Sequence, residues 1–198
     1  MKARRPSSPP PHQVRIIGGQ WRRTPLPVPD KDGLRPTPAR VRETLFNWLG
    51  QQLDGRRVLD AFAGSGALGL EAASRGAAEV LLVERDAKLA ASLRTTAARL
   101  KADKVQVRCG DGVAALAATS ALDLALLDPP FDAGLFDAAL AAAAAAVRVG
   151  GFIYLEAPRL WETEALAALG LQLRRHTRAG EVHAHLLVRE RAPSAIYS

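Results

Sequence analysis

The sequence predicts an α/β fold, a mostly parallel β-sheet covered by helices on both faces. After Gly55, apolar runs of strand length alternate with helix-length stretches, which is typical of βαβ units. The predicted strands are 57–62, 79–84, 104–109, 122–128 and 151–156, and the helices between them are 68–75, 87–100, 113–118 and 135–147. The tail differs, because 169–176 and 181–189 flank a turn at Ala179-Gly180. We expect this hairpin to close one edge of the sheet.

The charge of the chain is unevenly placed. Residues 1–57 carry 12 Lys and Arg against 4 Asp and Glu, whereas the rest carries 15 against 16. A basic segment attached to a near-neutral domain is typical of a nucleic-acid contact, although a merely solvated basic tail is the alternative. Residues 1–12 are rich in Pro, Ser and Arg and are predicted to be a disordered basic tail.

Several classes of protein are disfavoured by composition. The sequence has no run of 18 apolar residues, so no membrane span is predicted. The first residues lack the apolar stretch of a secretory signal, and we therefore expect a cytoplasmic protein. A single cysteine, Cys109, excludes an internal disulfide and a multi-cysteine zinc site. The four histidines lack metal-ligand spacing, so no metal is expected.

The first structured segment is predicted to be a β-hairpin over 14–28, with Gly18-Gly19 at the turn. It brings arginines beside Trp21, a composition suited to holding phosphates and stacking bases, though Trp21 could equally anchor the hairpin in a small core. An amphipathic helix follows over 39–49, with Thr37 as its candidate N-cap. Arg40 and Glu43 are expected on its outer face.

A glycine-rich turn follows the first strand of the sheet. Gly64, Gly66 and Gly69 match G-x-G-x-x-G, and Glu84 ends the next strand, which taken literally is a dinucleotide fingerprint. However, Asp60 lies directly before the glycines, where it would repel a diphosphate and suit an ammonium group. S-adenosyl-L-methionine satisfies both acids, and Asp111 offers a further acceptor for its adenine amino group. Alternatively, these acids are ordinary strand-end residues.

A second candidate site is Asp128-Pro129-Pro130-Phe131, which follows an apolar strand. The prolines fix φ and lack backbone donors, so carbonyl and carboxylate oxygens can accept the hydrogens of an exocyclic amino group. The ring can stack on the face of the same base. The alternative interpretation is a strand-ending turn with a core phenylalanine.

In order and spacing, the segments 60–66 and 128–131 with Glu84 and Asp111 resemble class I S-adenosylmethionine-dependent methyltransferases that act on exocyclic amino groups of bases. The blocks at 15–22, 34–37 and 40–49 resemble, more specifically, the RsmD family of bacterial 16S ribosomal RNA guanine-N2 methyltransferases. The similarity covers residues 14–190. It implies a Rossmann-like class I methyltransferase domain over 34–192, with a seven-stranded sheet whose last strand is antiparallel. Residues 13–33 would be an RNA-binding hairpin extension.

The resemblance also implies the site and the partners. The catalytic residues would be Asp128, Pro129, Pro130 and Phe131. S-adenosyl-L-methionine would be bound by Thr37, Asp60, Phe62, Ala63, Gly64, Ser65, Gly66, Glu84, Arg85, Gly110, Asp111, Gly112 and Asp128. The RNA would be gripped by Arg15, Trp21, Arg22, Arg23, Arg35 and Arg40. We expect a monomer that acts on 16S rRNA, naked or in the 30S subunit.

Phe131 occupies the position at which many adenine-modifying relatives carry tyrosine, so the tetrapeptide alone does not separate guanine from adenine. Three other functions are compatible with parts of the sequence: a DNA adenine-N6 methyltransferase, an NAD-dependent oxidoreductase and a non-catalytic RNA-binding protein on a methyltransferase fold. The oxidoreductase leaves the 128–131 motif unexplained. A specific DNA enzyme usually needs a separate recognition region, for which the chain has no spare length.

Overall fold

A single seven-stranded sheet forms the centre of the protein, in a computed structural model that describes residues 14–28 and 37–190. The strands are β3 (Arg57–Asp60), β4 (Glu79–Glu84), β5 (Val105–Cys109), β6 (Leu122–Leu127), β7 (Val147–Ala157), β8 (Leu171–Ala179) and β9 (Val182–Arg189). Their order is β5-β4-β3-β6-β7-β9-β8. Strands β3 to β7 pair in parallel, and β9 lies antiparallel between β7 and β8.

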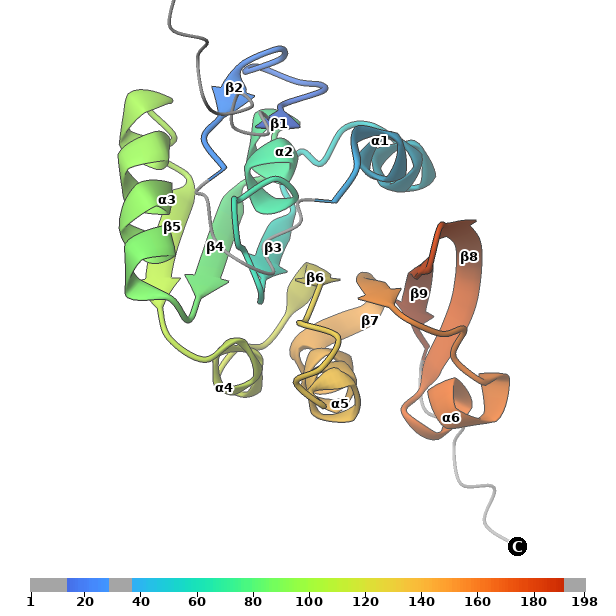
Figure 1. Ribbon diagram of the computed structural model, residues 1–198. Coiled ribbons are helices and arrows are strands. Elements are labelled where there is room, and N and C mark those ends of the chain that lie inside the picture. Colours follow the sequence, from blue (N-terminus) through green and yellow to red (C-terminus); the bar gives the residue numbers. More distant parts are fainter. Residues whose placement is uncertain (1–13, 29–36, 191–198) are drawn as a thin grey trace, which may run out of the picture.

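Helices cover both faces of this sheet (Figure 1). Helices α1 (Ala39–Trp48), α2 (Gly69–Ser74) and α3 (Ala87–Arg99) lie on one face, and α4 (Gly112–Ala117), α5 (Phe136–Ala146) and α6 (Thr163–Ala168) lie on the other. Buried side chains form one apolar cluster under each layer. Along β6, Leu124 and Leu126 enter one cluster while Ala125 and Leu127 enter the other. From Leu124 to Leu127 the strand is therefore apolar on both sides, as expected for a strand covered on both faces.

The predicted alternation of strands and helices and the hairpin at the tail are confirmed, whereas the short helix α6 was not predicted. The expected disordered tail at 1–12 and Arg35 lie outside the described residues. Within 14–28 and 37–190, no helix is both long and apolar enough to cross a membrane.

The N-terminal hairpin pairs β1 (Val14–Arg15) with β2 (Pro25–Leu26) in antiparallel register. The turn expected at Gly18-Gly19 is part of a longer loop, residues 16–24, which contains both glycines and lies against α2. A Cβ built on Gly19 would sit 1.8 Å from the Ser74 carbonyl oxygen, and Gly19 has φ +74°. Glycine is thus required for close approach to α2 rather than for a two-residue turn.

Helix α1 begins after Pro38, which is its N-cap and provides no side-chain capping bond. The expected N-cap role of Thr37 is therefore wrong. The Thr37 side chain is buried and instead hydrogen-bonds to the carboxyl groups of Asp128 and Glu156. The predicted outer face of the helix is confirmed, since Arg40 and Glu43 are exposed.

Candidate active site

Acidic side chains gather where the parallel strands end. Asp60 ends β3, Glu84 ends β4 and Asp128 directly follows β6. Leu127 pairs with Leu155 in the β6–β7 register, so the next residues along each strand, Asp128 and Glu156, are neighbours. This edge includes the boundary between β3 and β6, where the order of strands reverses and ligands of open α/β sheets bind.

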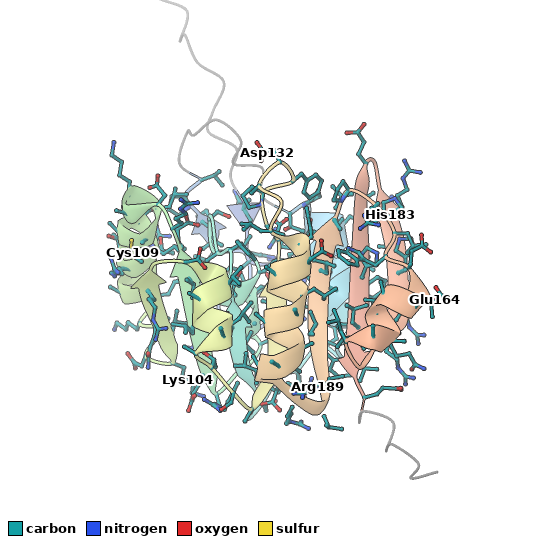
Figure 2. All side chains as sticks on the ribbon, turned by 90° about the horizontal axis from the view of Figure 1, so that it is seen from below. Lys104, Cys109, Asp132, Glu164, His183 and Arg189 are labelled. Carbon is teal, nitrogen blue, oxygen red and sulfur yellow. The ribbon has the colours of Figure 1, made fainter. Side chains whose placement is uncertain are left out.

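The same edge carries the loop after β6 and the β8–β9 turn. Figure 2 shows Asp132 and His183 toward one end of the sheet and Lys104 and Arg189 at the other.

Asp60 is buried at this edge with only part of its hydrogen-bonding capacity used. Its Oδ2 accepts the Gly69 N–H at 2.9 Å, while Oδ1 is buried without a partner in the described structure. Burial raises the pKa of Asp60 to about 7, the backbone N–H groups of Gly69 and Phe62 oppose this rise, and the charges of Glu84 and Glu156 add to it. A buried acceptor without a donor is costly, and a cationic or N–H-bearing ligand would satisfy it.

The glycines beside Asp60 leave no room for larger side chains, and we call the loop that they form the glycine cradle. A Cβ on Gly69 would sit 2.1 Å from Leu82 Cδ2 and 3.0 Å from Asp60 Oδ2. A Cβ on Gly66 would sit 2.7 Å from Leu93 Cδ2, and one on Gly112 would sit 2.0 Å from the Ala61 carbonyl oxygen. Glycine is therefore required for the close packing of this loop against β4, α3 and the start of α4.

Glu84 shapes the loop from the next strand. Its Oε2 accepts the Gly64 N–H and its Oε1 accepts the Asp86 N–H, both at 2.8 Å. Each oxygen keeps lone-pair capacity for a ribose hydroxyl. Asp111 lies beyond β5, where its Oδ1 caps α4 by accepting the Ala114 N–H at 2.8 Å.

The acid cluster also contains a residue that the sequence analysis missed. Glu156 is 4% exposed, and its Oε1 accepts a hydrogen bond from the buried Tyr154 hydroxyl at 2.9 Å. Burial raises the pKa of Glu156, while hydrogen bonds from Thr37 and Tyr154 oppose the rise. The signal was present, because Glu156 ends a predicted strand just as Glu84 and Asp128 do.

Asp128 is partly exposed and titrates together with its neighbours. Burial of its carboxyl group raises its pKa well above the ordinary value, the charges of Glu156 and Asp60 add to the rise, and a hydrogen bond from Thr37 opposes it. Neighbouring carboxylates disfavour one another's ionised forms, so a cation bound among them would be favoured.

The tetrapeptide projects its aromatic ring outward. Phe131 is 42% exposed and lies tilted against Phe136, with 6.0 Å between ring centroids, so the alternative of a core phenylalanine is wrong. Pro129 is buried and Pro130 is exposed. The Pro130 carbonyl accepts the Ala133 N–H at 3.2 Å, so this oxygen is used by the turn itself.

The remaining predicted cofactor residues lie around the same strand ends. Ala63 and Ser65 are buried, Phe62 and Gly110 are half-buried, and Arg85 is exposed. Together with the orphaned Asp60 oxygen and the glycine cradle, they fit an adenosine cofactor with a cationic amino-acid end. Among the described residues, no group of three or more His, Cys, Asp or Glu is placed to hold a metal ion.

The predicted RNA-binding residues lie apart from the acids, around the hairpin and α1. Arg15, Arg22, Arg23 and Arg40 are exposed, whereas Trp21 is partly buried and packs against the core, which fits the alternative of a hairpin anchor. A groove of about 790 Å³ separates the hairpin loop from α1, and Arg22, Asn47 and Gln51 contribute to its lining. None of the strand-end acids lines it.

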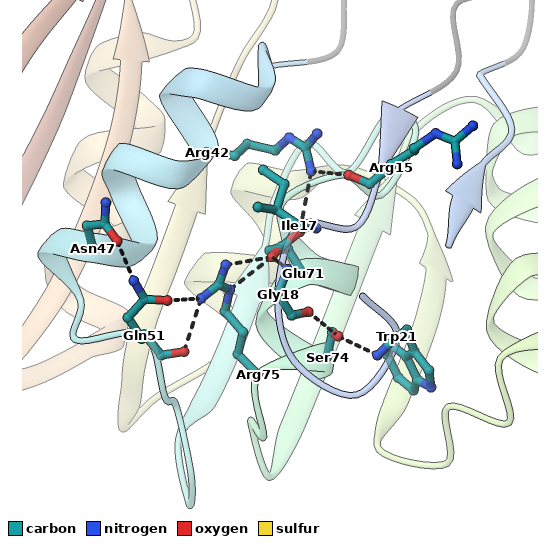
Figure 3. A network of polar contacts seen from close by, with 10 residues as sticks. All are labelled: Arg15, Ile17, Gly18, Trp21, Arg42, Asn47, Gln51, Glu71, Ser74 and Arg75. Carbon is teal, nitrogen blue, oxygen red and sulfur yellow. Dashed lines mark hydrogen bonds and ion pairs between the residues drawn. The ribbon is translucent and has the colours of Figure 1, made fainter. Parts of the chain in front are cut away.

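The sequence analysis also missed a buried ion-pair network behind the hairpin. Glu71 on α2 contacts the guanidinium groups of Arg42 at 3.4 Å and Arg75 at 2.9 Å, and all three side chains are at most 5% exposed. Figure 3 shows this network between the hairpin, α1 and α2. Arg42 lies within the helix block 40–49, but the helical pattern alone gave no reason to bury it.

Comparison with known proteins agrees with this geometry. Residues 14–188 match the model of the family described as Conserved hypothetical protein 95. Ribosomal RNA small subunit methyltransferase D of Escherichia coli is 50% identical over 126 residues, which is 63% of this chain and 64% of the relative, just under two thirds of its length.

Solved structures give the same result. The E. coli protein yhhF superposes with a TM-score of 0.80 at 39% identity, covering 91% of this chain and 99% of its own. The T. thermophilus 16S rRNA N2 methyltransferase RsmC, in complex with AdoMet and guanosine, gives a TM-score of 0.69 at 30% identity, covering 90% of this chain and 50% of its own. The predicted Rossmann-like class I methyltransferase fold, with its last strand antiparallel, is thus confirmed.

Proposed function

The chain belongs to the RsmD family, the one described as Conserved hypothetical protein 95, and from this premise we propose that it methylates the N2 amino group of a guanine in 16S rRNA. The methyl donor is S-adenosyl-L-methionine. The observation that carries the proposal is the cluster of Asp60, Asp128 and Glu156 at the strand edge, whose pKa values are all raised, beside a glycine cradle and an exposed aromatic ring.

The cofactor would be held by the cradle and by the acids around it. Asp60 would offer its unpartnered Oδ1 to the ammonium group, Glu84 would accept from the ribose hydroxyls, and Asp111 would accept from the adenine amino group. When bound, the sulfonium supplies an already activated methyl group, so the protein has to position the acceptor and place charge around it.

The acceptor nitrogen is a poor nucleophile, because its lone pair is delocalised into the guanine ring. The Asp128 carboxylate and the Pro129 carbonyl would accept its hydrogens and align the lone pair for an in-line displacement. Phe131 is exposed beside them and would stack on the extruded base, whose removal from its helix costs a few kcal/mol.

The raised pKa of Asp128 has a role in this scheme. The mutual repulsion that helps to raise the pKa of Asp128 is opposed by any cation bound beside Glu156 and Asp60. Binding of the positively charged cofactor therefore favours the ionised Asp128, which is the form that accepts hydrogens from the amino group. The protein would thus be prepared for the acceptor only when the donor is present.

The N-terminal hairpin with its exposed Arg15, Arg22 and Arg23 would grip the RNA, with Arg40 on α1 beside it. A monomer in the cytoplasm that acts on the assembled 30S subunit or an assembly intermediate is the arrangement we favour.

The test is incubation with methyl-labelled S-adenosylmethionine and 30S subunits that lack the modification, beside naked 16S RNA and duplex DNA. We expect label in RNA that digests to N2-methylguanosine. Label only in DNA would favour the adenine-N6 alternative, and bound cofactor without any transfer would leave an RNA-binding protein.

The role of Asp128 is tested in the same assay. Asp128→Ala is expected to abolish transfer nearly completely while cofactor affinity stays close to normal. Asp132→Ala, an exposed acid in the same loop, is the matched control and is expected to keep activity. Near-normal turnover of Asp128→Ala would contradict the assignment.

A further inference from the structure

The buried carboxylate of Glu71 is the centre of a network that joins separate segments (Figure 3). Its two oxygens accept the backbone N–H groups of Ile17 and Gly18, each at 2.7 Å, in addition to the ion pairs with Arg42 and Arg75. Glu71 is 0% exposed, and a charge buried this deeply requires such compensation. The hairpin is therefore held on α2 by the same carboxylate that holds both arginines.

The two arginines differ in what else they contact. Arg75 donates from Nη1 to the carbonyl oxygen and Oε1 of Gln51, at 3.2 and 2.9 Å, and so ties α2 to the segment after α1. Arg42 instead donates from Nη1 to the Arg15 carbonyl at 3.0 Å and from Nε to the Thr37 carbonyl at 3.2 Å. Arg42 thus joins strand β1 to the segment that leads into α1.

Thr37 continues this connection to the acid cluster. Its side chain hydrogen-bonds to the carboxyl groups of Asp128 and Glu156. Only Arg42 and Thr37 therefore separate the backbone of Arg15, in the hairpin, from the carboxyl group of Asp128.

We propose that Arg42 is a positioning residue that couples the seating of the N-terminal hairpin to the carboxyl groups of Asp128 and Glu156 through Thr37. The inference rests on the proposed function, in which the hairpin binds RNA and Asp128 takes part in methyl transfer. A guanidinium is planar and its donors are fixed relative to one another. Movement of β1 against α2 therefore turns the same rigid group that holds the Thr37 carbonyl.

The test compares Arg42→Lys with Arg75→Lys. Both variants keep a positive charge against Glu71, but a lysine ammonium in place of the Arg42 guanidinium cannot reproduce the separate Nε and Nη1 bonds to two carbonyl oxygens. We expect Arg42→Lys to lower kcat on the RNA substrate about tenfold or more, since small misplacements of reacting groups are costly. Arg75→Lys is expected to lower the unfolding temperature while kcat stays close to that of the wild type.

A double-mutant cycle with Thr37→Val separates coupling from general damage. If Arg42 acts through Thr37, Arg42→Lys changes kcat little once the hydroxyl is gone, so the two effects are not additive. Independent, multiplicative losses would overturn the proposal. Thr37→Val leaves the bonds of Arg42 intact and tests only the link from the Thr37 side chain to the carboxyl groups. Wild-type kcat in that variant would also overturn the proposal.

Amide hydrogen exchange gives a readout that needs no activity. Arg42→Lys is expected to speed exchange in both 14–18 and 37–44, whereas Arg75→Lys leaves 37–44 protected. Unchanged protection of 37–44 in Arg42→Lys would overturn the coupling even if the enzyme methylates RNA. Conversely, a wild-type protein that does not modify RNA contradicts the proposed function, and the exchange result still decides the mechanical link.

Discussion

The Tyr154 hydroxyl donates a hydrogen bond to the Glu156 carboxylate at 2.9 Å, and both side chains are buried in strand β7. This contact fixes Glu156 beside Asp128, whose pKa is raised first by burial and then by the charge of Glu156. Glu156 therefore tunes the residue that we expect to accept hydrogens from the guanine amino group.

Substitution of Glu156 by glutamine tests this tuning. Glu156→Gln keeps an acceptor for Tyr154 but removes the charge, so the pKa of Asp128 is expected to fall. Because the ionised Asp128 is the active form, the acidic limb of the kcat-against-pH profile should move to lower pH. Glu162→Gln, an exposed acid beyond β7, is the control. An acidic limb that stays in place would contradict the electrostatic role.

Asp60 predicts an unusual dependence of stability on pH. Its pKa rises from 3.8 to about 7 in the folded protein, so the native state binds this proton more tightly than the unfolded chain. The contribution of this proton to the free energy of unfolding is fully present below about pH 4 and is lost as the pH rises to about 7. The loss amounts to roughly 4 kcal/mol. Removing the ionisable group with Asp60→Asn should abolish this loss while keeping an acceptor for the Gly69 N–H.

The measurement has to be a difference, because other groups titrate in the same window. Burial lowers the pKa of His185 to about 4, so its contribution to stability grows as the pH rises from 4 to 6.5. Denaturant unfolding of wild type and Asp60→Asn from pH 4.5 to 7.5 isolates Asp60. We expect the stability of the wild type relative to Asp60→Asn to decline steadily with pH, and a constant difference would contradict the prediction. Asp132→Asn is the exposed control.

The predictable features share a physical basis. Strands covered on both faces are mostly apolar, and four of them carry an acid at or next to their last residue, so the sheet and most of the acid cluster could be located from the sequence. The role of Thr37 could not be predicted from the sequence, because a threonine before a helix is normally its N-cap. Here contacts with Asp128 and Glu156 from distant parts of the chain take the place of capping. Burial of Arg42 also depends on a partner from another helix, Glu71, which no local periodicity specifies.

A comparison of Gly19 with Gly55 distinguishes the cost of backbone strain from the cost of lost close packing. Both have φ +74°, but a Cβ on Gly19 meets the Ser74 carbonyl, whereas one on Gly55 has nothing within 4 Å. Alanine in this conformation costs roughly 1–2 kcal/mol, which is all we expect from Gly55→Ala. Gly19→Ala should cost clearly more and should speed amide exchange in 14–18. Equal free energies of unfolding for the two variants would contradict the close approach of the loop to α2.

The hairpin arginines are expected to bind RNA phosphates, which makes a quantitative prediction about salt. Arg22→Ala combined with Arg23→Ala removes two exposed guanidinium groups from the hairpin loop beside the groove. The slope of log K against log salt concentration should then become shallower by about 1.4 to 1.8, since each phosphate contact contributes about 0.7 to 0.9. Arg174→Ala combined with Arg175→Ala, two exposed arginines of β8, removes the same charge elsewhere. If both pairs flatten the slope equally, the effect is one of net charge, and the hairpin has no special part in gripping RNA.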